Sequence, residues 1–332
     1  MIIADKNIGE KHEPFIIAEV GINHNGDIEL AKKTILKAKE CGASAVKLQT
    51  FRAKTLCLQA APYYNLFEKC EFSESQIQEL NEFCKNLNIN IFSAVFDEWA
   101  INLWSNLNTI AIKIASGDIT HIPLLKHAAS KGFPMIVSTG GASDLEIKNA
   151  VKAIKSVNNN LPISLLHCIS NYPTNISDLN LNCIREMKEN YKIPIGFSDH
   201  TIGISASISA VAIGADLIEK HFTLDKNLEG PDHKLSSDPK EFKELVQGIR
   251  IAFKARGNDR KKVVEHTESI NAMRRSVTSS IDIAKGTKIE KNMLVIRRPG
   301  DGIQPIDIEK IIGLEAKINI KSNKTIYWDD II

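Results

Sequence analysis

Residues 193–233 read IPIGFSDHTIGISASISAVAIGADLIEKHFTLDKNLEGPDH, and this stretch decides the fold. Its pattern predicts a strand that leads into Ser198-Asp199-His200, a small-residue helix, and a second strand that ends at His221. A strand, a helix and a parallel strand of one sheet form a right-handed unit whose two strands usually lie side by side. Neighbouring strands are about 4.8 Å apart, so both imidazoles can reach one ion.

Two histidines at matching strand ends predict a metal site. Imidazole is a common ligand of divalent transition metals, so His200 and His221 are our candidate ligands. Two neutral rings leave coordination positions open, which fits manganese better than a closed zinc site. Magnesium and cobalt are the alternative metals, and two unrelated histidines near loops are the alternative interpretation.

The same alternation of strand and helix extends from residue 15 to about residue 255. The predicted strands are 15–20, 44–49, 89–94, 111–116, 134–139, 162–168, 194–198 and 216–222. The predicted helices are 28–41, 73–87, 98–105, 123–131, 144–157, 179–189, 203–213 and 239–255. Eight of each is the pattern of a closed (β/α)₈ TIM barrel. An open doubly wound sheet is the alternative, but VGINHNGD after the first strand is not its usual G-x-G-x-x-G loop.

The chain also changes character after the barrel. We predict a catalytic domain at 1–257, a polar linker at 258–273 and a small, mostly β domain at 274–332. Lys+Arg 42 against Asp+Glu 40 is nearly balanced, which gives no reason to expect nucleic acid or an acidic membrane surface as partner. The N-terminus resembles no signal peptide and the six cysteines contain no C-x-x-C pair, so we expect free thiols in the cytoplasm.

Catalysis in a TIM barrel takes place at the carboxyl ends of the strands, where this sequence places charged and hydroxyl side chains. Lys47 and Lys113 interrupt apolar strands, and serines follow separate strands at positions 116, 138 and 198. This combination suits a phosphate and a carboxylate. The alternative for each lysine is a buried salt bridge with Glu19 or Glu219. Lys220 alternates with His221, so we expect it to face away from the barrel mouth.

The chain contains nine ordered motifs: AEVGINHNGD (18–27), VKLQTF (46–51), FDE (96–98), IKIASGD (112–118), STGG (138–141), LLHCISNYPT (165–174), GFSDHTIG (196–203), IEKHFTLD (218–225) and GPDH (230–233). Together they resemble the sialic acid synthase family, which condenses phosphoenolpyruvate with an N-acetylated amino sugar. The tail from Arg274, with RRPGDG (297–302), resembles the antifreeze-protein-like SAF domain that ends such synthases.

The resemblance implies a role for each matching residue. A divalent metal would be held by His200 and His221. Phosphoenolpyruvate would be held by Lys47, Lys113, Ser116, Ser138 and Ser198, and the sugar would be surrounded by Glu19, Gln49, Tyr172 and Asp232. Arg298 of the partner subunit would reach the sugar's N-acyl group, which implies a domain-exchanged homodimer.

Four positions depart from the family pattern: Ala94, Asp118, Gly141 and Ser170. The family often has threonine, glutamate, methionine and asparagine there, respectively. Asp118 and Ser170 are still expected to contact substrate. The resemblance leaves two acceptors open: N-acetylmannosamine, or a different sugar such as a 2,4-diacetamido-6-deoxy hexose on the way to legionaminic acid, which these four changes would accommodate.

The expected reaction is metal-dependent and releases phosphate by C–O cleavage, giving a nonulosonic (sialic-type) acid. Glu19 or Asp232 would orient water or move a proton, and the sequence does not choose between them. Two other hypotheses remain open: a Schiff-base aldolase with Lys113 as nucleophile, and a non-catalytic sugar-binding protein.

Overall fold

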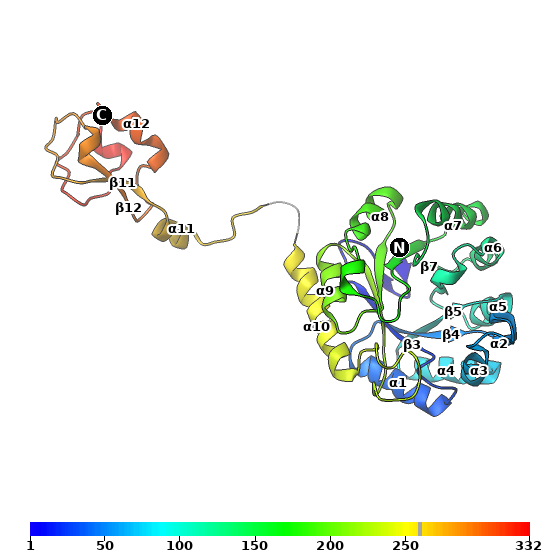
Figure 1. Cartoon of the computed structure of the whole chain (residues 1–332). Coiled ribbons are helices and arrows are strands. Elements are labelled where there is room, and N and C mark those ends of the chain that lie inside the picture. Colours follow the sequence, from blue (N-terminus) through cyan, green and yellow to red (C-terminus); the bar gives the residue numbers. More distant parts are fainter. Residues whose placement is uncertain (258–260) are drawn as a thin grey trace. The chain divides into compact units, whose positions relative to one another are not determined.

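The computed structural model describes residues 1–257 and 261–332, and these divide into a first unit, Met1–Gly257, and a second unit that takes the rest. Within residues 1–257, eight parallel strands close into a barrel in the order β10-β3-β4-β5-β6-β7-β8-β9 (Figure 1). The strands are β3 (Phe15–Gly21), β4 (Ala45–Thr50), β5 (Asn90–Val95), β6 (Ile112–Ile114), β7 (Met135–Ser138), β8 (Ile163–Cys168), β9 (Ile195–Asp199) and β10 (Leu217–His221). The predicted TIM barrel is confirmed.

A helix follows each barrel strand and covers the outside of the barrel (Figure 1). These helices are α1 (Ile28–Glu40), α4 (Glu74–Asn86), α5 (Glu98–Asn106), α6 (Ile122–Ser130), α7 (Asp144–Val157), α8 (Cys183–Tyr191), α9 (Ser205–Ala212) and α10 (Pro239–Arg256). Ser73 and Ser143 begin α4 and α7 with complete capping boxes. Such reciprocal bonds satisfy the first amides of each helix, which is why these two boundaries could be predicted closely.

The barrel interior changes from apolar to charged along its axis. Phe15, Ile17, Ala45, Phe92, Ile136, Leu166 and Leu217 form an apolar cluster inside the barrel, together with Ile3 and Ile8. Two residues further along the same strands come Glu19, Lys47, Ser138 and Glu219. Because side chains alternate across a strand, a step of two keeps the inward direction. Inside the barrel, the polar side chains near the carboxyl ends of the strands therefore lie directly above the apolar cluster.

Two features of the first unit were not predicted. A two-stranded hairpin, β1 (Ile2–Ile3) with β2 (Lys6–Asn7), contributes Ile3 to the apolar cluster inside the barrel. Two short helices, α2 (Ala53–Leu56) and α3 (Tyr64–Cys70), lie between β4 and α4. Strands of two residues and helices of one or two turns are too short to leave a periodic pattern in the sequence.

The second unit has its own small core. Antiparallel strands β11 (Ser276–Ser279) and β12 (Leu294–Arg297) pair, and short bridges join much of the remaining chain. Val277, Ile283, Ile289, Ile303, Ile311, Ala316, Ile320, Ile326 and Ile331 fill the interior. Helix α12 (Ile308–Ile311) belongs to this unit, while α11 (Thr267–Met273) falls within the predicted linker, whose residues 258–260 lie outside the described residues. No helix in the described ranges is long and apolar enough to cross a membrane.

Candidate active site

A pocket of about 230 Å³ opens at the carboxyl ends of the barrel strands. Most of the predicted site residues line it. The lining consists of Glu19, Lys47, Gln49, Ala94, Phe96, Lys113, Ala115, Ser116, Gly117, Ser138, Ser170, Tyr172, Ser198, His200, Glu219 and His221. The barrel thus brings together residues that are up to 200 positions apart in the chain, as active sites of TIM barrels require.

Ion pairs join the two lysines to two carboxylates at the base of this pocket. Lys47 Nζ lies 3.0 Å from Glu19 Oε2 and 3.5 Å from Glu219 Oε2, and all three side chains are buried. Glu19 Oε1 also accepts a hydrogen bond from Gln49 Nε2 at 3.0 Å. The salt bridges expected as the alternative role for the lysines are therefore present, and they lie inside the pocket rather than away from it.

Lys113 is held more by neutral groups than by charge. Its Nζ donates to Ser138 Oγ at 2.6 Å and to the Ile114 carbonyl at 3.0 Å, while Glu219 Oε1 is 3.9 Å away. Burial, with the positive charge of Lys47, lowers the pKa of Lys113 despite the attraction of Glu219. Of the two ammonium groups, Lys113 has the weaker carboxylate contact and is more available to an incoming anion.

The two carboxylates differ in their electrostatics. Burial raises the pKa of Glu19 to about 7, against the opposing attraction of Lys47. Burial acts on Glu219 in the same direction, but Lys113 and Lys47 outweigh it and lower the pKa of Glu219 to about 2. Ser198 Oγ donates to Glu219 Oε1 at 2.9 Å, which further favours its ionised form. Glu219 is therefore the fixed anion, and Glu19 is the carboxylate suited to move a proton near neutral pH.

Hydroxyl and backbone groups form the side of the pocket next to Lys113. Ser116 Oγ accepts from the Gly140 amide at 3.1 Å and lies 3.1 Å from Cys168 Sγ. A Cβ on Gly140 would lie 2.3 Å from Ser170 Oγ, 2.8 Å from Cys168 Sγ and 2.9 Å from Ser116 Oγ. A side chain at this position would push these polar groups apart, so the glycine lets them approach one another.

The two predicted metal ligands lie together at the mouth. The ring centroids of His200 and His221 are 5.5 Å apart, and the Tyr172 ring lies 4.2 Å from that of His200. Burial lowers the pKa of His200 to about 4 and that of His221 to about 3, helped by the neighbouring imidazole and by Lys47, respectively. Both rings are therefore neutral at physiological pH, the form that binds metals.

The hydrogen bonds of these rings fit a metal site. His200 Nδ1 lies 2.7 Å from the Ile169 carbonyl, which can only accept, so Nε2 of the neutral ring carries the lone pair. His221 Nδ1 is buried and has no hydrogen-bond partner in the described part of the chain. The described residues contain no cluster of three or more histidine, cysteine, aspartate or glutamate side chains suited to a metal. An ion here would thus rest on two imidazoles and retain open positions.

Three predicted site residues do not line the pocket. Asp232, in the loop after β10, places Oδ2 3.8 Å from His221 Nδ1 and remains at the margin of the site. Asp118 is half-buried beyond β6, and burial raises the pKa of its carboxyl group. Arg298 is exposed in the second unit. The roles assigned to these three residues stay predictions.

The structure adds Glu219 to the candidate site. From the sequence we expect it only as a salt-bridge partner, yet it contacts both lysines and Ser198. The signal was present, because Glu219 lies two residues before His221 and shares its inward face. Of the four departures from the family pattern, Ala94 and Ser170 line the pocket, whereas Asp118 and Gly141 do not.

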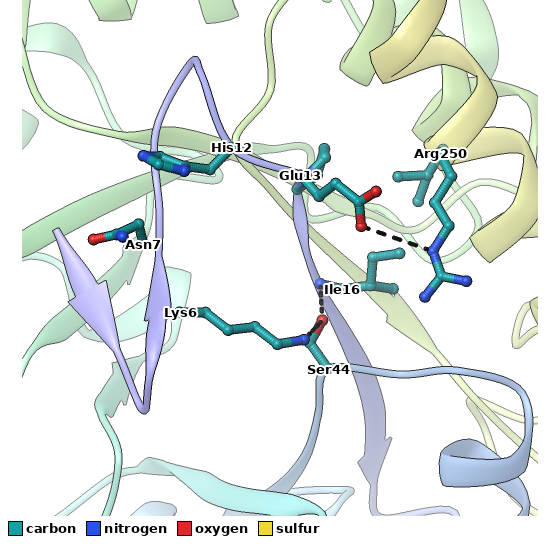
Figure 2. A pocket seen from close by; sticks show the side chains of 9 residues that line it. Lys6, Asn7, His12, Glu13, Ile16, Ser44 and Arg250 are labelled. Carbon is teal, nitrogen blue, oxygen red and sulfur yellow. Dashed lines mark hydrogen bonds and ion pairs between the residues drawn. The ribbon is translucent and has the colours of Figure 1, made fainter.

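A second pocket, of about 240 Å³, is lined by residues of the hairpin, β3 and α10. Its titratable residues are Lys6, His12, Glu13 and Arg250 (Figure 2). Lys6 Nζ donates to Ser44 Oγ at 3.3 Å, and Arg250 Nε lies 4.0 Å from Glu13 Oε2. All four side chains are exposed. The residues that line this pocket belong to a different part of the barrel from those of the mouth.

Comparisons with known proteins agree with this geometry. The NeuB family model matches residues 34–261, and the SAF domain model matches residues 274–332. The N,N'-diacetyllegionaminic acid synthase of Legionella pneumophila is 42% identical, over 96% of this chain and 94% of its own length. The pseudaminic acid synthase of Helicobacter pylori is 35% identical, over 96% and 98%.

A solved structure gives the same result. The crystal structure of N-acetylneuraminic acid synthetase from Leptospira borgpetersenii, in complex with citrate, matches with a TM-score of 0.78 and 37% identity. The match covers 81% of this chain and 94% of that one. The two family models and the near-full-length relatives together extend over the barrel that carries the pocket and over the small domain. The chain therefore belongs to the NeuB family, as a synthase of the sialic acid type that ends in a SAF domain.

Proposed function

We propose that this synthase condenses phosphoenolpyruvate with an N-acetylated amino sugar, giving a nonulosonic acid and inorganic phosphate. The main observation behind this proposal is that two buried lysines and two neutral imidazoles line the same pocket. The lysines and the serines beside them suit a small, multiply charged anion. The imidazoles suit a divalent cation that faces the same space.

Phosphoenolpyruvate would occupy the side of the pocket near Lys113. Its phosphate and carboxylate groups would compete with Glu219 for the ammonium groups of the two lysines. Among the described residues, Glu219 and Glu19 are the only anionic partners of these ammonium groups. Ser116, Ser138 and Ser198 would supply neutral donors around the oxygens. The substrate anion would contact Lys113 directly, in place of the 3.9 Å ion pair between Lys113 and Glu219, and this exchange favours binding.

The residues of the chain would then guide two bond-forming steps. The methylene carbon of phosphoenolpyruvate attacks the aldehyde carbon of the open-chain sugar, and water adds to the resulting cationic carbon that bears the phosphate. The C–O bond to phosphate breaks and the keto acid forms. Glu19 has the raised pKa needed to take the proton from that water, and Asp232 remains the alternative.

A divalent metal at His200 and His221, with manganese first and magnesium or cobalt as alternatives, would supply Lewis acidity to the sugar aldehyde. The sugar would lie toward Gln49 and Tyr172, at the outer side of the pocket. Arg298 of the partner subunit would reach the N-acyl group in a domain-exchanged homodimer. Similarity to the N,N'-diacetyllegionaminic acid synthase of Legionella pneumophila supports a 2,4-diacetamido-6-deoxy hexose over N-acetylmannosamine as acceptor.

A phosphate-release screen tests this function. The enzyme is stripped with a chelator and supplied with phosphoenolpyruvate, with either N-acetylmannosamine or a 2,4-diacetamido-6-deoxy hexose, and with or without Mn²⁺. We expect release only with sugar and metal present, and faster release with the diacetamido sugar. No sugar-dependent release with either acceptor would contradict the proposal.

One observation favours a second candidate, the Schiff-base aldolase. Burial lowers the pKa of Lys113, as the nucleophilic amine of such an enzyme requires. Borohydride in the presence of pyruvate would then trap a covalent adduct on Lys113. We expect no adduct and full inhibition by chelator, because Lys113 donates to Ser138 and Ile114 as a bound ammonium group.

A further inference from the structure

A second charged pair joins β9 and β10 on the outer side of the barrel wall. Lys220 Nζ lies 3.2 Å from Asp199 Oδ2, and both side chains are 0% exposed. Lys220 and Asp199 are directly opposite in the strand register, one position before His221 and His200. Because side chains alternate along a strand, the pair faces the helices while the histidines face the pocket.

The carboxylate of this pair is saturated with hydrogen bonds. Asp199 Oδ1 accepts from the amide and the hydroxyl of Thr201, at 2.8 and 2.7 Å, and Oδ2 accepts from Ser207 Oγ of α9 at 2.6 Å. Lys220 Nζ donates in addition to the Thr201 carbonyl. His200 therefore lies between two residues that are both bound to one buried ammonium group.

We propose that the Asp199–Lys220 pair positions His200 and His221 as a metal-binding unit. The inference rests on the proposed function, since it concerns the ion assigned to these imidazoles. Lys220 fixes the backbone on both sides of His200, and its own peptide leads directly into His221. The separation of the two rings, 5.5 Å between centroids, is thus set from outside the pocket. Residues that orient ligands usually affect metal affinity without touching the ion.

The chain offers a matched control near the opposite ends of β9 and β10, in an ion pair between α8 and the residue before β10. Lys188 Nζ lies 2.9 Å from Asp216 Oδ1, and Asp216 Oδ2 accepts from the Ile195 amide at 3.0 Å. Asp216 lies just before β10, and Ile195 begins β9, so this ion pair supports the ends where the two strands begin. Its loss should reduce stability in a similar way but leave the histidine ends in place.

The test measures Mn²⁺ binding to the full chain. Bound metal is first removed with a chelator, and the electron paramagnetic resonance signal of free Mn²⁺ then reports how much added Mn²⁺ stays unbound. The variants are Lys220→Met, the double variant Asp199→Asn/Lys220→Met, and the control Lys188→Met/Asp216→Asn. The double variant leaves no unpaired buried charge, so it keeps the test valid if Lys220→Met alone does not fold. Melting temperatures without metal record stability separately.

We expect the Asp199→Asn/Lys220→Met enzyme to bind Mn²⁺ on the order of tenfold more weakly than the wild type. The control should bind it with unchanged affinity at a lowered melting temperature. If the wild type binds Mn²⁺ through His200 and the folded double variant binds it equally well, the proposed function stands and this inference is wrong. The inference is also wrong if the control loses affinity equally. If the wild type binds no Mn²⁺, or His200→Ala binds it normally, the metal site itself is overturned.

Discussion

Two pockets of the barrel have nearly equal volumes, about 230 Å³ at the mouth and about 240 Å³ beside the hairpin. They differ in how their charges are held. Lys47, Lys113 and Glu219 of the mouth pocket are buried and fixed by several partners each. Lys6 and Arg250 of the hairpin pocket are exposed, with single, long contacts (Figure 2). Cavity volume alone therefore does not mark an active site.

The difference has a physical reason. Burying a charge is costly unless partners compensate for the lost hydration, so a barrel keeps buried lysines only where their positions serve a purpose. The carboxylates that compensate for Lys47 and Lys113 also orient them before the substrate arrives, which makes the site preorganised. Exposed lysine and arginine side chains are solvated by water, so their positions are not fixed before a substrate binds. The same substitution at the two pockets should therefore have very different effects.

The largest effect is expected from Lys113→Met. The substitution removes the ammonium group with the weakest carboxylate contact, which we assign to the substrate anion. We expect kcat/KM for phosphoenolpyruvate to fall by about 10³-fold, as for the loss of one preorganised donor in other enzymes. The measurement is phosphate release at saturating sugar, with the melting temperature as a check on folding. A folded variant with a loss of less than tenfold would show that Lys113 does not hold the anion.

His200→Ala should have the next largest effect. It removes one of two candidate metal ligands, so we expect at least about 100-fold lower turnover and lost Mn²⁺ binding, with the barrel still folded. His12→Ala, at the exposed histidine of the hairpin pocket, is the control and should change neither quantity. Near-normal turnover of His200→Ala under metal-free conditions would refute the metal site.

The strands of this barrel could be predicted closely because each carries a short apolar run that ends in polar residues. The predicted 89–94 and 216–222 became Asn90–Val95 and Leu217–His221. The opposite directions of Lys220 and His221 followed from alternation along their strand. The sequence could not predict that Lys220, expected to face away from the mouth, is fully buried against Asp199. Such a contact depends on strand register, which only the closed barrel determines.

The sequence also could not predict which groups each charged side chain contacts. Glu19 and Glu219 were equal candidates for both lysines, and the structure gives Lys47 to both carboxylates and Lys113 mainly to Ser138. The proton-carrying role of Glu19 becomes arguable only once Glu219 is known to lie beside it. A sequence shows which charges enter the barrel, whereas their pKa values depend on distances of a few ångströms.

Gly140→Ala tests whether close packing at the mouth matters as much as charge. The new methyl group would lie 2.3 Å from Ser170 Oγ and 2.8 Å from Cys168 Sγ, so Ser170 would have to move in the pocket wall. We expect KM for phosphoenolpyruvate to rise by about 10- to 100-fold. In Gly248→Ala, a methyl group of α10 would lie 2.4 Å from Ile208 Cδ1, a similar clash against an apolar side chain. The Gly248→Ala variant should have a lowered melting temperature and an unchanged KM for phosphoenolpyruvate. If both variants have the same KM, the clash at Gly140 affects only the structure and not substrate binding.

The smallest effect is expected from Lys6→Met and Arg250→Met in the hairpin pocket. Both side chains are exposed, so each substitution should change the free energy of unfolding by no more than about 0.5 kcal/mol. Turnover should stay within about twofold, because the apolar cluster inside the barrel separates this pocket from the charged mouth and transmits no charge. Lys6→Met is the same chemical change as Lys113→Met, so the ratio of their effects measures directly what burial adds to a lysine. A large loss of turnover in Lys6→Met would mean that the two pockets are coupled and that exposure is no guide to function in this barrel.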